Sequence, residues 1–212
     1  MTWINTLKGK RVSLLNPDRV LLDIKEIAHA LSRINRFTGH IKPEHYSVAE
    51  HSVRCSLFAA AWGRPLETQL WALLHDAHEA FVGDISTPMK HAMHSRLAVG
   101  KLVGGFAEDF DVEIAARFMP GGDVSWDAAN DVKSIDAWAV HYEADRLLSK
   151  RTDWEHQPPK FDRALERTQP VPLGWNPDRA KRYFLRRYSY LQRTLAQAST
   201  AAMEKESARA AA

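Results

Sequence analysis

The sequence predicts an all-α fold, a helix bundle that carries a metal site in its core. Three observations lead to this prediction. Apolar residues recur at helical spacing in several segments that Gly and Pro turn signals separate. No segment shows a convincing alternation of apolar and polar residues, the pattern of a half-buried strand. Histidines and carboxylates also follow closely on the most apolar of the helical segments.

The first third of the chain combines an irregular start with two capped helices. Residues 1–20 read as an irregular lead-in that includes the turn signal Asn16-Pro17-Asp18. Asp23 can cap a short helix, whose apolar face is Ile24, Ile27, Ala28 and Leu31. Residues 35–46 are expected to form a loop. Ser47 and Glu50 match a capping box, which predicts a second helix that ends before Gly63.

Five more helices are expected further along the chain. Four of them span the ranges 66–81, 97–118, 128–148 and 176–197, and the second is expected to be interrupted near Gly104-Gly105. The fifth begins at Ser86-Thr87-Pro88, after a break at Gly83. Pro120-Gly121-Gly122 is a turn, and residues 158–172 read as an extended connection. We expect a single domain over residues 1–197 and disorder in the alanine-rich tail 198–212.

Composition excludes several classes of protein. A single cysteine, Cys55, cannot form an internal disulfide framework and fits a reducing cytoplasm. No apolar run approaches the roughly 20 residues of a membrane span, and the N-terminus lacks a secretory signal. We therefore expect a cytoplasmic protein without a membrane partner. The net charge is +3, and the main basic cluster, residues 179–187, reads as a solvated helix face, so we do not expect a nucleic-acid partner.

The segment His75-Asp76-Ala77-His78-Glu79 follows an apolar stretch of helix. His75 and Glu79 are four residues apart, and Asp76 and Glu79 are three apart, so each pair can share one helix face. Such groups are costly to bury unless they are paired or bound to a metal. The alternative is a helix end where polar groups emerge into solvent, and this segment alone does not decide between the two.

Two other segments favour the metal site. His51 lies one turn beyond the Ser47 cap, and Asp136 is a single carboxylate in a largely apolar helix. Each alone is more often structural than a ligand. Together with His75 and Asp76 they offer two imidazoles and two carboxylates. This mixed set suits divalent Co, Mn, Zn, Fe or Ni better than calcium, and helix bundles commonly build metal sites from such inward-facing side chains.

The order His51, His75-Asp76, Asp136 resembles the H…HD…D signature of the HD-domain phosphohydrolases. Within that superfamily the chain resembles the bacterial 5′-deoxynucleotidases and the phage deoxyadenosine-triphosphate phosphohydrolases, over roughly residues 27–148. An HD dipeptide alone is a weak signal, whereas the full ordered set is specific. The resemblance rests on residues 34–37 (INRF), 46–52 (YSVAEHS), 75–79 (HDAHE), 83–90 (GDISTPMK) and 132–136 (VKSID).

The resemblance implies roles for nine residues and a homo-oligomer, either a dimer or a larger assembly. The metal ligands would be His51, His75, Asp76 and Asp136. The groups for proton transfer, or for placing the attacking water, would be Glu79 and Asp84. The substrate contacts would be Arg36, Phe37 and Lys90. Phe37 stands where 5′-deoxynucleotidases carry a tryptophan near the sugar, which leaves the preference for deoxyribose open.

Elementary chemistry supports these roles independently. The anionic oxygens of a phosphate ester repel nucleophiles, and a bound cation neutralises that charge and lowers the pKa of coordinated water. Arg36 can meet phosphate oxygens through a planar fork, while Lys90 follows a helix start whose free N–H groups favour anions. Glu79 could exchange protons with the water or the leaving group.

Several alternatives stay open on the sequence alone. His91 and His94 form a second histidine pair without a flanking carboxylate, and His40 and His45 could line a nucleotide pocket. The same site could act on a cyclic or alarmone nucleotide instead of a mononucleotide or a triphosphate. A non-catalytic nucleotide sensor, or a nucleic-acid-associated protein with a structural metal, is the third interpretation. A structural metal site would not need the carboxyl groups Glu79 and Asp84 or the phosphate-binding residues Arg36 and Lys90.

Overall fold

The fold is all-α, as the sequence predicts, apart from one short hairpin. The computed structural model describes residues 1–97, 100–149 and 172–210, and helices account for most of them. The helices are α1 (Ile24–Leu31), α2 (Val48–Ala61), α3 (Leu66–Leu74), α4 (Glu79–Val82), α5 (Thr87–Leu97), α6 (Gly100–Phe118), α7 (Trp126–Leu147) and α9 (Pro177–Ala210). Single 3-10 turns lie at η1 (Arg19–Leu21), η2 (Phe37–Gly39) and η3 (Pro120–Gly122).

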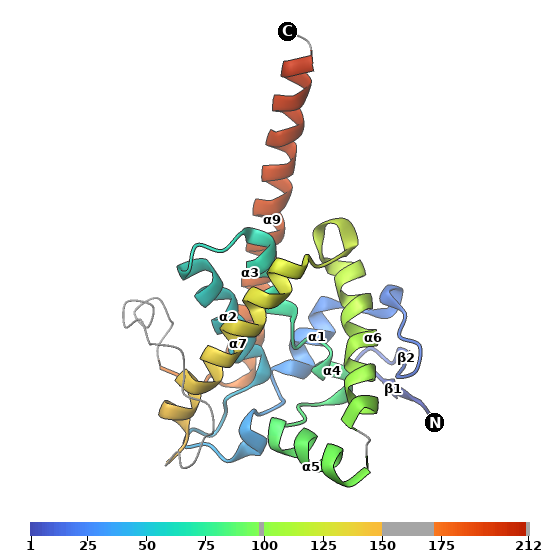
Figure 1. Ribbon diagram of the computed structural model, residues 1–212, viewed down its shortest axis with the longest axis vertical. Coiled ribbons are helices and arrows are strands. Elements are labelled where there is room, and N and C mark those ends of the chain that lie inside the picture. The colour runs from blue at the N-terminus through green and yellow to red at the C-terminus, as the bar shows by residue number, and fades with distance from the viewer. Residues whose placement is uncertain (98–99, 150–171, 211–212) are drawn as a thin grey trace.

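Helix α2 lies at the centre of the bundle. It packs against α3, α7 and α9, while α1 and α6 flank the other side of the body (Figure 1). Most of its side chains are buried, including the polar residues Glu50, His51, Ser52 and Arg54. Aromatic side chains fill the space towards α7, where Phe58 meets Trp138 edge-on with a centroid separation of 4.3 Å. Polar groups on α2 must therefore find partners inside the protein.

Only half of the capping box predicted for α2 forms. The Ser47 hydroxyl accepts a hydrogen bond from the backbone N–H of Glu50 (3.3 Å), as expected of an N-cap. The Glu50 side chain does not return to Ser47. It accepts instead from Arg54 (2.6 Å) and from the backbone N–H groups of Gly174 (3.2 Å) and Trp175 (2.7 Å). Glu50 thus ties α2 to the segment that leads into α9.

The N-terminus differs from the irregular lead-in that the sequence predicts. Strands β1 (Trp3–Asn5) and β2 (Arg11–Ser13) pair antiparallel, with Ile4 opposite Val12. Three-residue strands are too short to show an alternating pattern, so the sequence did not reveal this hairpin. The hairpin contacts α1 through Lys8, whose backbone N–H donates to Glu26 (2.7 Å) and whose ammonium pairs with Asp23. Asp23 caps α1 as expected.

The predicted helix over 66–81 is broken at the position of the candidate ligands. Helix α3 ends at Leu74, residues 75–78 form a turn, and α4 begins at Glu79. Across the turn the hydrogen bonds become i→i+3, from Ala77 N–H to the Leu74 carbonyl (2.8 Å) and from Glu79 N–H to the Asp76 carbonyl (3.0 Å). Tighter turns of this kind are common where a helix changes direction at a functional position.

The remaining helices differ from prediction mainly at their ends. The break expected near Gly104-Gly105 is not seen, because α6 runs unbroken from Gly100. Helix α7 starts at Trp126, two residues early, behind the Ser125 N-cap. The predicted connection over 158–172 falls almost wholly outside the described residues.

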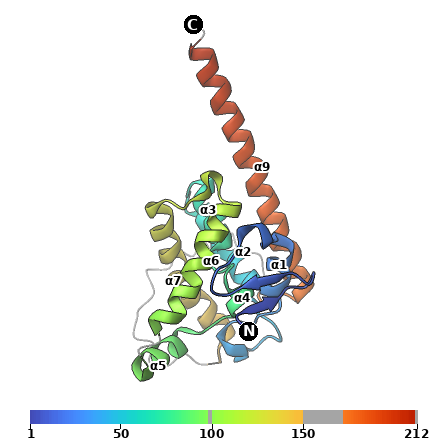
Figure 2. The same ribbon diagram turned by 90° about the vertical axis from the view of Figure 1, so that its right-hand side faces the viewer.

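Helix α9 is much longer than predicted. It continues to Ala210 and leaves the body of the molecule over its C-terminal part (Figures 1 and 2). Residues 198–210 were expected to be disordered; they are helical and exposed. Alanine has the highest helix propensity, so a low-complexity run rich in alanine can extend a helix that is already nucleated. No helix in the described ranges is both long and apolar enough to cross a membrane.

Candidate metal centre

Three helical segments bring the four predicted metal ligands together. His51 lies in the first turns of α2, His75 and Asp76 lie in the turn after α3, and Asp136 lies in the middle of α7. His51 Nε2 lies 3.1 Å from Asp136 Oδ1, 3.4 Å from Asp76 Oδ2 and 3.4 Å from His75 Nε2. His75 Nε2 lies 3.4 Å from Asp76 Oδ1 and 3.9 Å from Asp136 Oδ1.

These separations fit ligands around a single ion. With metal–ligand bonds of 2.0–2.3 Å, the ligand atoms of a tetrahedral site lie about 3.3–3.8 Å apart. The buried Oδ1 of Asp136 also accepts no hydrogen bond from the described residues. This oxygen lies 3.1 Å from His51 Nε2 and 3.9 Å from His75 Nε2, so the three atoms could bind one divalent cation together. A metal ion could therefore be held here, and the donor set leaves its identity open.

Cys55 lies in the same cluster. Its Sγ is 3.4 Å from His51 Nε2, and His51, Cys55, His75 and Asp136 each place a ligand atom within 4.8 Å of the others. Burial raises the pKa of the Cys55 thiol to about 11, so it is not a reactive nucleophile at neutral pH. Cys55 is not among the predicted metal ligands, although its i, i+4 spacing from His51 is a possible signal.

Glu143 is the main functional residue that the sequence analysis missed. It is fully buried, and its Oε1 lies 2.6 Å from His51 Nδ1 and accepts the Tyr46 hydroxyl at 2.7 Å. A carboxylate on Nδ1 fixes the tautomer that leaves Nε2 free for a metal. Glu143 follows Asp136 by seven residues on α7, which places both on one helix face. This seven-residue spacing was the feature of the sequence from which Glu143 could have been predicted.

Arg36 lies against the ligand carboxylates. Its guanidinium contacts Asp76 Oδ2 at 3.2 Å and Glu143 Oε2 at 3.3 Å, and lies 4.0 Å from Asp136 Oδ1. Burial opposes its charge, but Glu143 and Asp76 hold its pKa well above the ordinary value. The backbone of Arg36 donates to the Tyr46 carbonyl (2.9 Å), which anchors the 35–46 loop beside the centre. The predicted phosphate-binding arginine is therefore at the site.

At the centre, the acidic groups and the histidines shift one another's pKa values towards the charged forms. Burial opposes ionisation of Asp136, but the nearby imidazoles of His51 and His75 keep its pKa well below the usual range. Burial likewise opposes protonation of His75, while Asp76 and Asp136 raise its pKa. Asp76 has a lowered pKa because His75 and His51 outweigh its burial. The carboxylates are thus ionised and able to bind a cation.

The two predicted catalytic carboxyl groups lie next to this centre. Glu79 is 5% exposed, and burial, followed by the charges of Asp76 and Asp84, raises its pKa to about 9. Asp84 is partly buried, and burial and Asp76 raise its pKa as well. Glu79 is therefore protonated at neutral pH in this environment. A carboxylic acid beside a cation site is suited to proton transfer.

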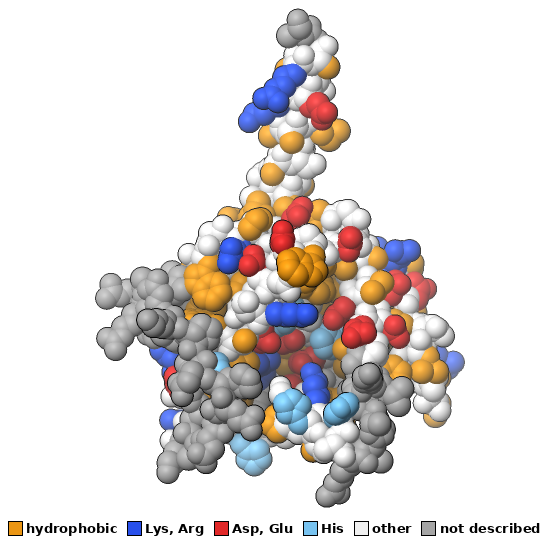
Figure 3. Space-filling view, in the orientation of Figure 1, with side chains coloured by type: hydrophobic (Ala, Val, Ile, Leu, Met, Phe, Trp, Pro, Cys, Tyr) orange, Lys and Arg blue, Asp and Glu red, His pale blue; other side chains and the backbone are white. Residues whose placement is uncertain are grey.

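The structure brings the predicted substrate contacts less close. Phe37 is half-buried in η2 with a positive φ of 54°, and Lys90 is exposed on α5. In the described part of the chain neither makes a hydrogen bond or ion pair with the four predicted ligands, although the charge of Lys90 is one of those that oppose the rise in the pKa of Asp84. Figure 3 shows acidic and histidine side chains gathered in a hollow of one face, between basic side chains. His91 and His94 are exposed and belong to no metal-type cluster among the described residues.

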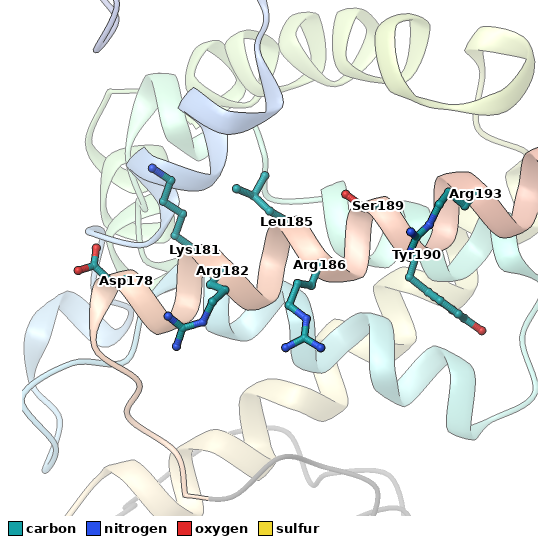
Figure 4. Close-up of a pocket in the computed structure, with 8 residues that line it drawn as sticks. All are labelled: Asp178, Lys181, Arg182, Leu185, Arg186, Ser189, Tyr190 and Arg193. Atoms are coloured by element: carbon teal, nitrogen blue, oxygen red, sulfur yellow. The ribbon is translucent and has the colours of Figure 1, made fainter.

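The basic cluster near the C-terminus is separate from this centre. A shallow depression runs along α9 and is lined by Asp178, Lys181, Arg182, Leu185, Arg186, Ser189, Tyr190 and Arg193 (Figure 4). No ligand of the candidate metal centre lines it. Arg187, on another face of α9, instead donates to Ser56 and Gln69 at 2.9 and 2.7 Å. Within the basic cluster, Arg187 therefore packs against the body of the protein, whereas the residues that line the depression form a solvated face.

Comparison with known proteins places the chain in a family without assigning an activity. No family model matches it. It is similar to an uncharacterized protein of Rhodobacter capsulatus, with 35% identity over 153 residues, 68% of this chain and 72% of the relative. It is also similar to the uncharacterized protein YfdR of Escherichia coli K12, with 40% identity over 95 residues, 44% of this chain and 49% of the relative. The chain belongs to the family of the Rhodobacter capsulatus protein.

Proposed function

We propose that this protein is a metal-dependent phosphohydrolase of the HD superfamily that removes phosphate from nucleotides, as a 5′-deoxynucleotidase or a deoxynucleoside-triphosphate phosphohydrolase. One observation carries the proposal. His51, His75, Asp76 and Asp136, widely spaced in the sequence, converge in the order of the HD signature with separations of 3.1–3.9 Å. Arg36, Glu79 and Asp84, the partners that a purely structural metal would not need, adjoin the same centre.

A divalent cation bound here would neutralise phosphate charge and lower the pKa of a coordinated water molecule. The residues of the chain do the rest. Glu143 orients His51 through Nδ1, and the Ala72 carbonyl fixes His75 in the same way, at 3.0 Å from its Nδ1. Both imidazoles therefore present Nε2 to the centre.

Arg36 supplies the positive fork for the substrate. In the structure its guanidinium pairs with Asp76 and Glu143. A cation held by Asp76 would compete for that carboxylate, and Arg36 could then exchange this partner for phosphate oxygens while keeping Glu143. Planar bidentate contacts favour phosphate over less charged groups. Lys90, at the exposed rim, would add a second positive charge.

Glu79 and Asp84 divide the proton transfers. Glu79 carries a proton at neutral pH and can donate it to the oxygen of the leaving nucleoside or nucleotide. Asp84 is less buried than Glu79 and can accept a proton from the attacking water. We further expect a cytoplasmic homo-oligomer, as in the similar enzymes, with a small-molecule nucleotide as its substrate.

The test is identification of the hydrolysis products of deoxy- and ribonucleotides at the mono-, di- and triphosphate level. A cyclic nucleotide and an alarmone are added to the panel, and their hydrolysis would give a nucleoside monophosphate and pyrophosphate, respectively. The assay contains Mn or Co. We expect turnover by the wild type and none above background by Asp76→Ala, while Asp127→Ala, an exposed aspartate at the start of α7, keeps full activity. Orthophosphate identifies a monophosphatase and tripolyphosphate a triphosphohydrolase. No turnover of any member by metal-loaded wild type would refute the proposal.

A further inference from the structure

A second group of metal-type side chains lies beside the first and shares one residue with it. Asp76, His78 and Glu79 each place one ligand atom within 4.8 Å of the others. They stand on the turn between α3 and α4, where the predicted helix is broken. Their side chains are largely shielded, with 14% of Asp76 and 12% of His78 exposed. His78 has no role in the function proposed above.

His78 is held as a metal-binding histidine usually is. Its Nδ1 lies 2.9 Å from Asp111 Oδ1, a carboxylate that α6 supplies from 33 residues away. A carboxylate on one ring nitrogen orients the imidazole and makes the other nitrogen a better ligand. The same arrangement joins Glu143 to His51 in the first centre. The pairing of His78 therefore repeats a feature of the candidate metal centre on a different helix.

One oxygen of Glu79, unpartnered in the described part of the chain, is an independent indication that a ligand binds at this cluster. Its side chain is buried, and its Oε2 is shielded from solvent and has no hydrogen-bond donor among the described residues. Buried carboxyl oxygens are almost always satisfied, so each exception calls for a missing partner. A partner that binds Glu79 would also contact Asp76 and His78, the other two members of this cluster.

The balance of charge favours a cation as the partner. Six carboxyl groups gather at the two clusters: Asp76, Glu79, Asp84, Asp111, Asp136 and Glu143. Among the described residues the buried fixed positive charge facing them is Arg36, and Lys90 is exposed. When all six carboxyl groups are ionised, Arg36 and a single divalent ion leave this region negative, which would repel an anionic phosphate substrate. A second one largely removes that repulsion.

We propose a second divalent cation site formed by Asp76, His78 and Glu79, with Asp76 shared between the two ions. Its catalytic meaning rests on the proposed function, because paired ions are a common way to clamp the attacking and leaving oxygens of a phosphoryl group. A cation at this site would displace the proton that Glu79 otherwise carries at neutral pH. Glu79 would then no longer serve as the proton donor described above, and Asp84 would remain as the carboxyl group for proton exchange. The site itself does not depend on the substrate.

Metal counting tests the site without relying on activity. The full-length chain is stripped with a chelator, equilibrated with excess Mn²⁺ by dialysis, and its bound manganese is measured per chain. We expect two equivalents for the wild type and one for His78→Gln. The matched control is His29→Gln, a histidine on α1 whose charged neighbours are Arg33, Lys181 and Asp178, and it should keep two. Electron paramagnetic resonance should show a spin-coupled Mn pair in the wild type and in His29→Gln, but not in His78→Gln.

A second variant keeps the test decisive if His78→Gln fails to fold. Asp111→Asn preserves the shape of the side chain and should weaken the second equivalent about 10- to 100-fold while leaving the first unchanged. One equivalent in the wild type, unaffected by either substitution, overturns the second site. If a wild type with one equivalent still releases phosphate, the proposed function holds without the second metal site. Two equivalents without phosphate release would support the site and refute the function.

Discussion

At the scale of single residues, the most informative side chain is Glu143, which binds no substrate and yet touches three members of the site. Its two oxygens meet His51, Tyr46 and Arg36 within 2.6–3.3 Å. Burial opposes its charge, but His51 and Arg36 keep its pKa below the ordinary value. Glu143 therefore acts through its neighbours, as a positioning residue.

Replacing this carboxylate should weaken metal binding. Glu143→Gln keeps the volume but removes the charge that orients His51 and balances Arg36. We expect the affinity for Mn²⁺ to fall about 10- to 100-fold, as for other residues that support a ligand histidine. A titration of the stripped protein measures this. Glu44→Gln, at a 91% exposed carboxylate, is the control that should not change, and equal affinities in both variants would contradict the role.

Asp23 offers a test of electrostatics away from the site. Lys8 chiefly, and the backbone N–H of Lys25 as well, lower its pKa. A lowered folded-state pKa means that the stabilisation is complete above the unfolded-state value of about 3.9 and is lost as the pH falls through the folded-state pKa. Asp23→Asn retains an N-cap but not the charge. The variant should therefore be slightly less stable than the wild type at pH 7, with the gap closing below about pH 4.

Urea unfolding at several pH values measures that gap. Asp109→Asn, at an exposed position on α6, should show no pH-dependent difference from the wild type. A gap that stays constant from pH 7 to pH 3 would show that the Asp23 charge contributes nothing.

At the scale of elements, the central problem is how α2 can carry charged groups through the core. Arg54 and Glu50 are both fully buried and lie 2.6 Å apart, and Glu50 also accepts two backbone N–H groups at the entry to α9. Such a pair is costly to form but far more costly to break. Glu50 thus fixes the position of the bundle's last helix.

Glu50→Ala should lower the free energy of unfolding by about 3–5 kcal/mol, because Arg54 would remain charged and buried without its partner. Chemical denaturation provides the measurement. Glu67→Ala, an exposed glutamate in α3, should stay within about 0.5 kcal/mol of the wild type. A similar loss of unfolding free energy in both variants would mean that the Glu50 contacts stabilise the fold no more than an exposed glutamate does.

The projecting end of α9 should be dispensable for the fold. A chain that ends at Gln197 loses only exposed residues among those described. We expect its unfolding free energy to stay within about 0.5 kcal/mol of the full chain and its metal content to be unchanged, while the helical signal in circular dichroism decreases. A substantial loss of stability would show that residues 198–210 pack against something, such as a second copy of the chain.

Sequence patterns predicted the elements better than their junctions. Asp23, Ser47 and Ser86-Thr87-Pro88 mark helix starts because capping is local chemistry. The break at residues 75–78 was hidden, since the apolar pattern runs through it, and the β1–β2 hairpin was too short to detect. In the site, the four candidate ligands followed from an ordered motif. Glu143, Cys55 and Asp111 act through tertiary contacts, which residue spacing only weakly indicates.

At the scale of the whole molecule, the bundle serves to hold ligand groups from α2, the α3–α4 turn and α7 around one point. Each group comes from a different part of the chain, so the site exists only when the bundle is folded. A bound cation should in turn stabilise the fold, by mass action, because the unfolded chain lacks the assembled site. Metal content, stability and activity are therefore expected to change together.

The most direct test of this account is removal and return of the metal in one preparation. Phosphate release from a deoxynucleotide is measured before chelation, after dialysis against a chelator, and after addition of Mn²⁺. We expect activity to fall to background on chelation and to return with manganese in the wild type, and to stay at background throughout in Asp136→Asn. Phosphate release that survives complete removal of the metal, or that Asp136→Asn retains, would contradict the central claim that this centre performs the reaction.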